Sequence, residues 1–257
     1  MPGVNFQRSY ALGDIYLAVQ KRADLLLKQY IKYPDLYAFD DSRRTITFSS
    51  ERLIPIRNSN RPRIMLLFSN PHPFSIHQGM FLAPNTKGQE SPFWSTMRES
   101  GWINYPKEHL TPKQLADICL NVQYEGPFEL IFYCYYAFPT NYPGDISKIF
   151  GKKYFKQVIV PEAYNELRKT IQETNVKAVV TFNKGIFNLV SSDPVRIYIQ
   201  RLANGEQIRG EIKDFERDIP IFLTYPTGWR FHKQYMQLRK DSLVEIRTEI
   251  SRELDKP

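Results

Sequence analysis

Two short polar loops contain the residues best suited to chemistry. The first, residues 69–81, begins Ser-Asn-Pro-His-Pro and ends Gln-Gly-Met-Phe; the second, residues 225–230, reads Tyr-Pro-Thr-Gly-Trp-Arg. Amide, imidazole, hydroxyl and phenol groups can orient a water molecule or a polar ligand, and aromatic rings can stack on a planar one. Each loop directly follows an apolar run that is typical of a buried strand. The two loops are therefore the first candidates for a binding or catalytic site.

Four apolar runs predict the strands that position these loops, at residues 64–68, 130–134, 178–182 and 219–224. Pro220 restricts the last run to an edge strand or to the start of a strand. Segments with helical patterning accompany the runs, at 92–101, 111–120, 161–174, 183–192 and 231–254. This alternation predicts an α/β fold, a three-layer α/β/α arrangement with a mostly parallel four-stranded central sheet. Ligands bind at the carboxyl ends of such strands, where both loops fall.

The remaining segments predict additions to this core. Residues 1–60 predict an N-terminal extension packed on the main domain at 61–257, with an amphipathic helix at 10–32 and a short strand within 44–60. Within the main domain, a charged insertion at 193–217 fits either a helix from Pro194 to a Gly205 cap or a hairpin around Asn204-Gly205.

Composition limits the class of protein. The 257 residues carry a net charge of +8, with 42 % apolar and 24 % charged residues. These values suit one globular domain and exclude wholesale disorder or a fibre. Two cysteines and four scattered histidines show no metal-ligand spacing, and no apolar run is long enough to span a bilayer. We expect a soluble, cytoplasmic monomer without metal or cofactor. The basic charge suits either a polyanion partner or an ordinary basic protein.

Taken together, the two loops resemble those of the uracil-DNA glycosylase superfamily. The resemblance is closest to its mismatch-specific, thymine-DNA glycosylase-like branch and to its single-strand-selective branch, and it covers about residues 62–254. The matching residues in the first loop are Asn70-Pro71, Pro73-Phe74, Ser75, Gln78, Gly79 and Phe81, and Phe93-Trp94 match in the segment after it. The second loop, Tyr225-Pro226-Thr227-Gly228-Trp229, aligns with changes to the family's Asn-Pro-Ser-Gly-Leu. We expect Phe93 and Trp94 to be core residues whatever the function.

The resemblance implies a monofunctional DNA glycosylase that flips a uracil or another deaminated base out of DNA and hydrolyses its N-glycosidic bond. Asn70 would position the water that attacks C1′, and Tyr225 stands at the place of the family's second-loop catalytic residue. The other implied substrate-binding residues are Ser69, His72, Gly79, Phe81, Cys134 and Tyr135, with Phe81 stacking on the base. The implied DNA-binding residues are Thr227, Gly228, Trp229, Arg230 and Lys233, with Trp229 as the wedge that fills the vacated stack.

The chain departs from the family pattern at several positions. Phe68 and His72 replace glycines, Tyr225 replaces a histidine or asparagine, and residues 133–136 replace a segment with a base-reading asparagine. Two alternatives to a DNA glycosylase therefore stay open. One is a catalytically reduced module that binds DNA or a nucleotide, and the other is an enzyme acting on a modified or free nucleoside. Retention of the first-loop residues favours an enzyme, whereas the altered second loop favours a binding module.

Basic residues follow Trp229 along the chain, at Arg230, Lys233, Arg239 and Lys240, and predict a contact with the DNA backbone. The double substitution Arg230→Gln/Lys233→Gln should weaken DNA binding and reduce the slope of log K against log salt concentration by about 2, because two counterion-releasing contacts are lost. Fluorescence anisotropy titrations at several salt concentrations measure this. Arg252→Gln/Lys256→Gln is the control, and equal effects of the two double variants would contradict a localised phosphate contact.

Overall fold

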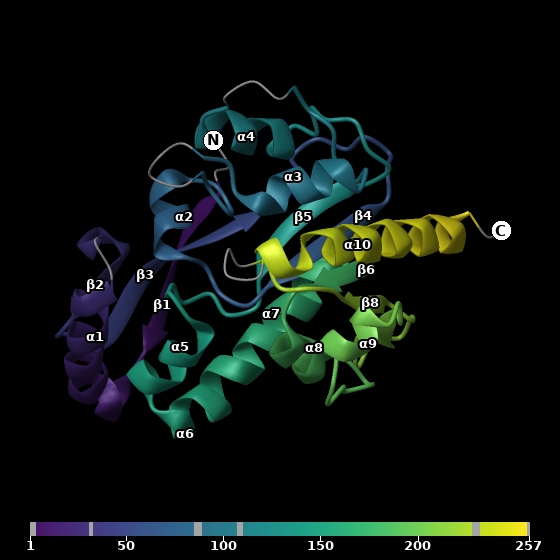
Figure 1. The fold of residues 1–257 in the computed structure, drawn as a ribbon. Coiled ribbons are helices and arrows are strands. Elements are labelled where there is room, and N and C mark those ends of the chain that lie inside the picture. Colours follow the sequence, from purple (N-terminus) through teal and green to yellow (C-terminus); the bar gives the residue numbers. More distant parts are fainter. Residues whose placement is uncertain (1–3, 31–32, 85–88, 107–109, 228–231, 256–257) are drawn as a thin grey trace.

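The computed structural model describes residues 4–30, 33–84, 89–106, 110–227 and 232–255, which form an α/β fold around one mixed sheet (Figure 1). The strands are β1 Asn5–Ala11, β2 Tyr37–Asp40, β3 Thr45–Leu53, β4 Arg63–Phe68, β5 Glu129–Cys134, β6 Val176–Thr181, β7 Ile208–Glu211 and β8 Pro220–Leu223. The helices are α1 Tyr16–Tyr30, α2 Pro73–Gln78, α3 Pro92–Glu99, α4 Pro112–Leu120, α5 Pro143–Phe150, α6 Lys152–Tyr154, α7 Val160–Glu173, α8 Lys184–Val190, α9 Ile199–Ala203 and α10 His232–Leu254. Short 3₁₀ turns lie at Gly13–Ile15 and Pro34–Leu36, and a π-helical turn at Phe155–Ile159 joins α6 to α7.

The four predicted strands form the parallel core of the sheet, in the spatial order β5-β4-β6-β8. In β4, Met65 and Leu67 belong to the hydrophobic cluster on one face, and Ile64 and Leu66 to the cluster on the other. Burial on both faces explains why these strands are unbroken apolar runs in the sequence. Pro220 is the first residue of β8, a position that needs no ladder hydrogen bond from its nitrogen.

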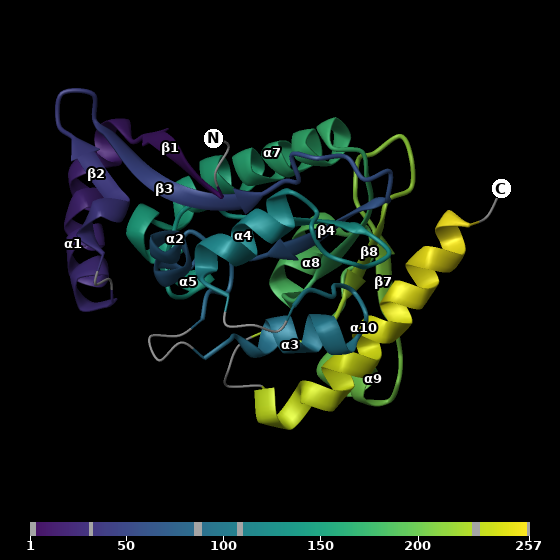
Figure 2. The ribbon, with the colours of Figure 1, turned by 90° about the horizontal axis from the view of Figure 1, so that it is seen from above.

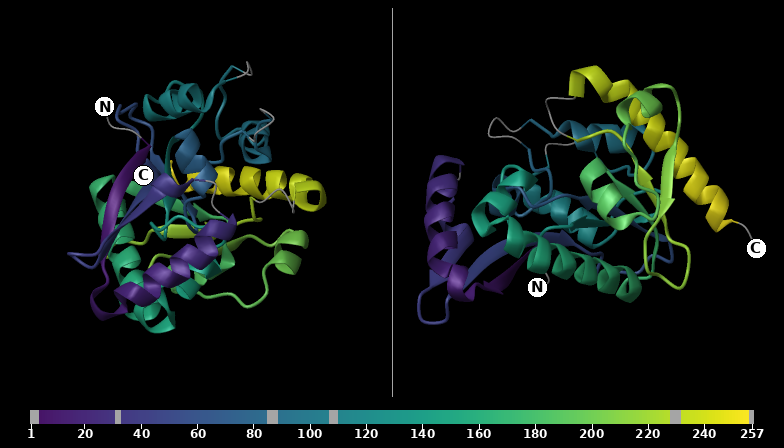
Figure 3. Two further views of the ribbon diagram at one scale, coloured as in Figure 1. Left: turned by 90° about the vertical axis from the view of Figure 1, so that its left-hand side faces the viewer. Right: turned by 90° about the horizontal axis from the view of Figure 1, so that it is seen from below.

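Helices cover both faces of the sheet. Residues of α1, α5, α7 and α8 pack on one face, and residues of α3, α4 and α10 pack on the other. Figure 2 shows α10 alongside α3, while Figures 2 and 3 place α1 at the opposite end of the molecule from α10. Phe93 and Trp94 on α3 are fully buried, as expected of core residues. No described helix is long and apolar enough to cross a membrane.

The N-terminal segment contributes more to the sheet than the sequence indicates. The helix expected from residue 10 begins at Tyr16, because residues 5–11 form β1, which is antiparallel to β3. Tyr10 anchors β1 through edge and tilted contacts with Phe150 and Phe48. At its far end β3 pairs with β5 in antiparallel register, with Arg52 opposite Tyr133. The sheet therefore has eight strands in the described residues, rather than four.

The charged insertion at 193–217 forms a short helix before Gly205, and the described residues form no hairpin around Asn204-Gly205. The helix α9 ends at Asn204, and Gly205 follows with a positive φ of 77°. The chain then forms β7, which pairs with β8 rather than with a strand of its own hairpin. Helices α2 and α5 are additions that the sequence pattern does not predict.

Burial of β3 in the core leads to a test of this arrangement. Leu53 is fully buried opposite Phe132, so Leu53→Ala should lower the free energy of unfolding by about 3 kcal/mol. Leu25 on α1 is exposed, and Leu25→Ala should change it by no more than about 0.5 kcal/mol. Urea denaturation measures both, and a small effect of Leu53→Ala would show that β3 is not part of the core.

Candidate active site

A pocket of about 340 Å³ opens at the carboxyl ends of the parallel strands. Its lining follows the order of the strands across the sheet. Glu51 comes from β3, Cys134 from β5, Phe68 and the residues after it from β4, Phe182 and Asn183 from the end of β6, and Pro226 and Thr227 from the end of β8. The complete lining is Glu51, Phe68, Ser69, Asn70, His72, Ser75, Phe81, Leu82, Cys134, Pro143, Phe182, Asn183, Pro226 and Thr227.

Strand order explains why the pocket forms there. The chain leaves β4 for β5 on one side, whereas it leaves the neighbouring β6 for β8 on the other side. Connections that leave neighbouring strands in opposite directions open a crevice at their carboxyl ends. The first loop occupies this crevice. It turns into α2, which ends at Gly79 in the left-handed conformation that glycine adopts without strain.

Asn70 is held in one orientation. Its Nδ2 donates to the carbonyl oxygen of Thr140 at 2.6 Å, to the Thr140 Oγ1 at 3.0 Å and to the carbonyl oxygen of Pro71 at 3.1 Å. Its Oδ1 accepts from the hydroxyl of Ser69 at 3.0 Å. Carbonyl oxygens accept only, so the amide nitrogen must face Thr140 and Oδ1 must face away from it. Asn70 thus presents an acceptor oxygen with room for a second hydrogen bond.

Aromatic rings form the apolar part of the lining. Phe68 and Phe182 are stacked at 5.3 Å, and Phe81 lies tilted against Phe68 at 5.6 Å. Phe81, the expected stacking residue, is 2 % exposed, whereas Phe68 at 9 % is the more open ring. Phe68 therefore enlarges the aromatic surface at a position where the resembled family has glycine. Planar apolar surfaces of this kind favour a flat, aromatic ligand.

Glu51 is a lining residue that the sequence pattern does not single out. It is 4 % exposed, its Oε2 has no hydrogen-bond partner, and the backbone N–H of His72 donates to its carboxyl. Burial raises the pKa of Glu51 from 4.5 to about 8, and the His72 N–H offsets only part of that effect. The sequence offers one indication that Glu51 is buried: it is two residues before Leu53 on a β-favouring segment, so both side chains lie on the same face of the strand. The strand that pairs with this segment lies far along the chain.

His72 connects the first loop to this carboxyl. Its Nδ1 accepts from the backbone N–H of Phe74 at 3.2 Å and so caps α2. The proton of the neutral ring is therefore on Nε2. Desolvation lowers the pKa of His72 although the residue is exposed, so the ring is neutral at pH 7.

Three of the expected site residues do not line the pocket. Tyr225 is fully buried, stacks on Tyr235 at 5.4 Å, and belongs to the hydrophobic cluster on the α7–α8 face, with no partner for its hydroxyl. Tyr135 lies in the same cluster and donates to the carbonyl oxygen of Val160. Side chains alternate along a strand, so Cys134 faces the pocket while Tyr135 faces the opposite layer. Gly79 acts as the cap of α2.

The expected DNA-contacting segment is described only in part. Thr227 lines the pocket, whereas Gly228, Trp229, Arg230 and the side chain of Lys233 lie outside the described residues. Arg239 is not available to phosphate, contrary to the sequence-based prediction. Its side chain is fully buried without a hydrogen-bond partner, and burial lowers the pKa of Arg239 to about 10. It lies two turns or less from Leu243 and Ile246 on the core-facing side of α10.

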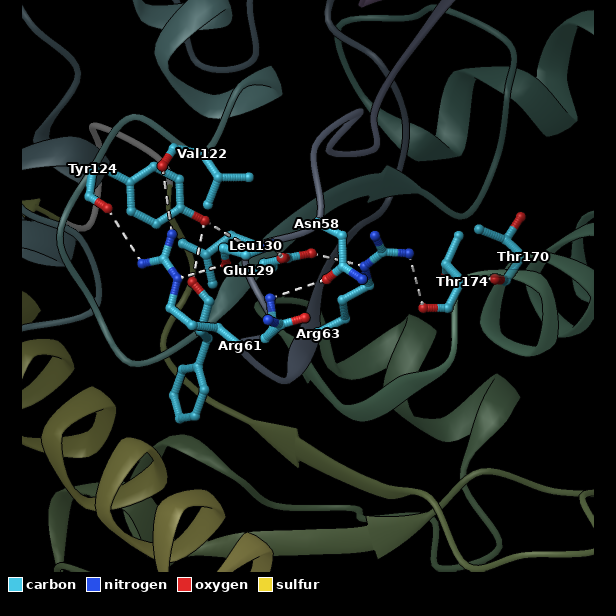
Figure 4. A network of polar contacts seen from close by, with 12 residues as sticks. Asn58, Arg61, Arg63, Val122, Tyr124, Glu129, Leu130, Thr170 and Thr174 are labelled. Carbon is cyan, nitrogen blue, oxygen red and sulfur yellow. Dashed lines mark hydrogen bonds and ion pairs between the residues drawn. The ribbon is translucent and has the colours of Figure 1, made fainter.

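A larger cavity, of about 610 Å³, lies at the opposite edge of the sheet. The arginines that line it are bonded to other groups of the protein. Figure 4 shows the network beside it. Arg61 donates to the carbonyl oxygens of Tyr124 and Gly126, and Arg63 pairs with the buried Glu129 at 2.8 Å. Although burial alone would raise it, hydrogen bonds from Arg63 and Ser59 lower the pKa of Glu129. Because both arginines already bond to groups within the protein, the pocket at the carboxyl ends of the strands is the better candidate for a functional site.

Neither a metal-binding group among the described residues nor a similarity to a known protein assigns a function to the pocket. Within the described part of the chain, no three His, Cys, Asp or Glu side chains are grouped to hold a metal ion. Cys119 and Cys134 are free and buried, and burial raises the pKa of the Cys134 thiol.

In comparisons with known proteins, no family model matches the chain and no curated protein sequence matches it significantly.

The raised pKa of Glu51 has a consequence for stability. In the folded protein this carboxyl keeps its proton up to about pH 8, whereas in the unfolded chain it ionises near 4.5, so stability is lost as pH rises between these values. Glu51→Gln cannot ionise and keeps the acceptor for the His72 N–H. It should therefore be more stable than wild type by roughly 3 kcal/mol at pH 7, and by little at pH 4.5.

Urea denaturation across this pH range measures the difference. Glu216→Gln is the control, because Glu216 is exposed. A stability gain in Glu51→Gln that is equal at every pH would contradict a buried, titrating carboxyl.

Proposed function

We propose that the chain is a DNA glycosylase-like hydrolase, which cleaves the N-glycosidic bond of uracil or another deaminated base in DNA. The observation that carries this proposal is the fixed orientation of Asn70 in a pocket with an aromatic wall. Its acceptor oxygen, its aromatic neighbours and its place at the carboxyl ends of the strands suit an extruded base whose C1′ is attacked by water.

The reaction requires few protein groups. Departure of the base leaves an oxocarbenium-like sugar, which needs a positioned water more than a strong base. Asn70 Oδ1 accepts a hydrogen bond from that water, while Thr140 and Ser69 prevent rotation of the amide. Such orientation lowers the barrier because the water no longer loses freedom on reaching the transition state. The stacked Phe68 and Phe182 hold the plane of the base.

A DNA- or nucleotide-binding module without catalysis is the second candidate. Burial of Tyr225 favours it, because the phenol cannot replace the histidine or asparagine that the resembled family uses at that place. A base would then bind to the aromatic wall without being released.

An excision assay separates the two candidates. Single- and double-stranded oligonucleotides carrying uracil, hypoxanthine, xanthine or hydroxymethyluracil are incubated with the protein, and base release is measured. We expect release of at least one base, and a reduction of about 100-fold or more in Asn70→Ala, because the water loses its orientation.

Asn165→Ala is the matched control, because Asn165 is exposed on α7. Circular dichroism checks that Asn70→Ala still folds without its bonds to Thr140. If wild type binds the oligonucleotides but releases no base from any of them, the chain is a binding module.

A further inference from the structure

Glu51 lies at the junction between the N-terminal segment and the pocket. It is on β3, one residue before the position where Arg52 pairs with Tyr133 of β5. Continuing that antiparallel register places Glu51 beside Cys134, and both residues line the pocket. Arg52 points to the other face, where its guanidinium covers the ring of Phe6. Arg52, the cation nearest to Glu51 in the sequence, therefore does not neutralise the Glu51 carboxyl.

The two oxygens of the Glu51 carboxyl are not equivalent. One accepts the backbone N–H of His72, while Oε2 is buried and has no partner in the protein. A buried carboxylate without a cation is unfavourable, so the group keeps a proton, and that proton belongs on the oxygen that accepts nothing. The other titratable groups that line the pocket are His72 and Cys134, and both are neutral, since the pKa of His72 is lowered and that of Cys134 is raised.

The second loop does not supply the donor that a departing base needs. Tyr225 faces the opposite layer, and Thr227 is the described second-loop residue with a hydroxyl at the pocket. An anion that leaves into a partly aromatic pocket, with only neutral donors in its lining, is poorly stabilised. A proton from within the pocket removes this difficulty, because the base then leaves as a neutral molecule.

We propose that Glu51 is the general acid of the reaction and donates its carboxyl proton to the departing base. This inference rests on the proposed glycosylase function. As the C1′–N bond breaks, its electron pair stays on the base, which takes the proton from the Glu51 carboxyl at the pocket wall. Water oriented by Asn70 then forms the new C1′–O bond and releases a proton, which restores the acid form of Glu51. The products are the free neutral base and an abasic sugar.

A general acid makes two kinetic predictions. The rate of base release requires the protonated form of Glu51. For wild type, kcat/KM should therefore decrease about tenfold per pH unit above pH 8, where Glu51 ionises. The acid also matters more for a base that is a poor leaving group. Uracil is a poorer leaving anion than 5-fluorouracil, so removal of the acid should slow uracil release more.

The experiment measures release of uracil, 5-fluorouracil and hypoxanthine from otherwise identical single-stranded oligonucleotides. Wild type, Glu51→Gln, Glu51→Asp and the exposed control Glu216→Gln are compared, with uracil over a pH series and the two pyrimidines at pH 6.5. We expect Glu51→Gln to release uracil about 100-fold or more slowly, with a smaller loss for 5-fluorouracil and without the decrease above pH 8. Glu51→Asp, which keeps an acid, should retain the decrease at high pH.

Each outcome decides a different point. If wild type releases none of the three bases, the proposed function fails and the role of Glu51 fails with it. If wild type is active and Glu51→Gln matches it in rate and pH profile, only the general-acid role is wrong. A folded Glu51→Gln that loses activity equally for both pyrimidines, with an unchanged pH profile, would make Glu51 a positioning residue and overturn the proposal.

Discussion

The pairing of β3 with β5 is the contact on which the candidate site depends. Its register, Arg52 opposite Tyr133 and Leu53 opposite Phe132, runs antiparallel to the core strands. The residues that precede the paired end of β3 therefore lie at the carboxyl ends of β4 and β5, where the pocket opens. In this way a segment outside the parallel core closes one side of the pocket and places a carboxyl in it. Strand β3 also pairs with β1 and β2, so the β3–β5 pairing joins the N-terminal segment to the rest of the sheet.

Two buried glutamates show how differently one side chain behaves at the two edges of the sheet. Glu129 is fully buried at the amino end of β5, and Arg63 and the backbone N–H of Ser59 hold it ionised. Glu51 at the carboxyl edge has no cation among the described residues, and one of its oxygens lacks any partner. Burial costs are offset in the first case by an ion pair and in the second by retention of a proton. The first arrangement keeps a charged carboxylate in the core, whereas the second leaves an unpaired, protonated carboxyl at a pocket.

The sequence predicts the parallel core because a strand buried on both faces is an unbroken apolar run, as in 64–68 and 178–182. It also places Asn70 and Phe81 at the pocket, because both belong to a loop that directly follows such a run. Tyr135 and Tyr225 were misplaced, since the face that each takes depends on the exact residue at which its strand ends. Glu51 was missed for another reason. Its role depends on pairing with a strand more than eighty residues further along the chain, and no local pattern encodes that contact.

The state of Glu51 also bears on the choice between an enzyme and a binding module. A carboxylate in the pocket would repel the phosphates of a nucleic acid, and keeping the group neutral there lowers the stability of the folded protein above pH 4.5. A protein that only binds a base gains nothing from this that an amide could not provide, since glutamine offers a donor without the penalty. The buried, unpaired carboxyl therefore supports the proposed enzyme over the proposed binding module, even though the second loop lacks the residue that the resembled family uses.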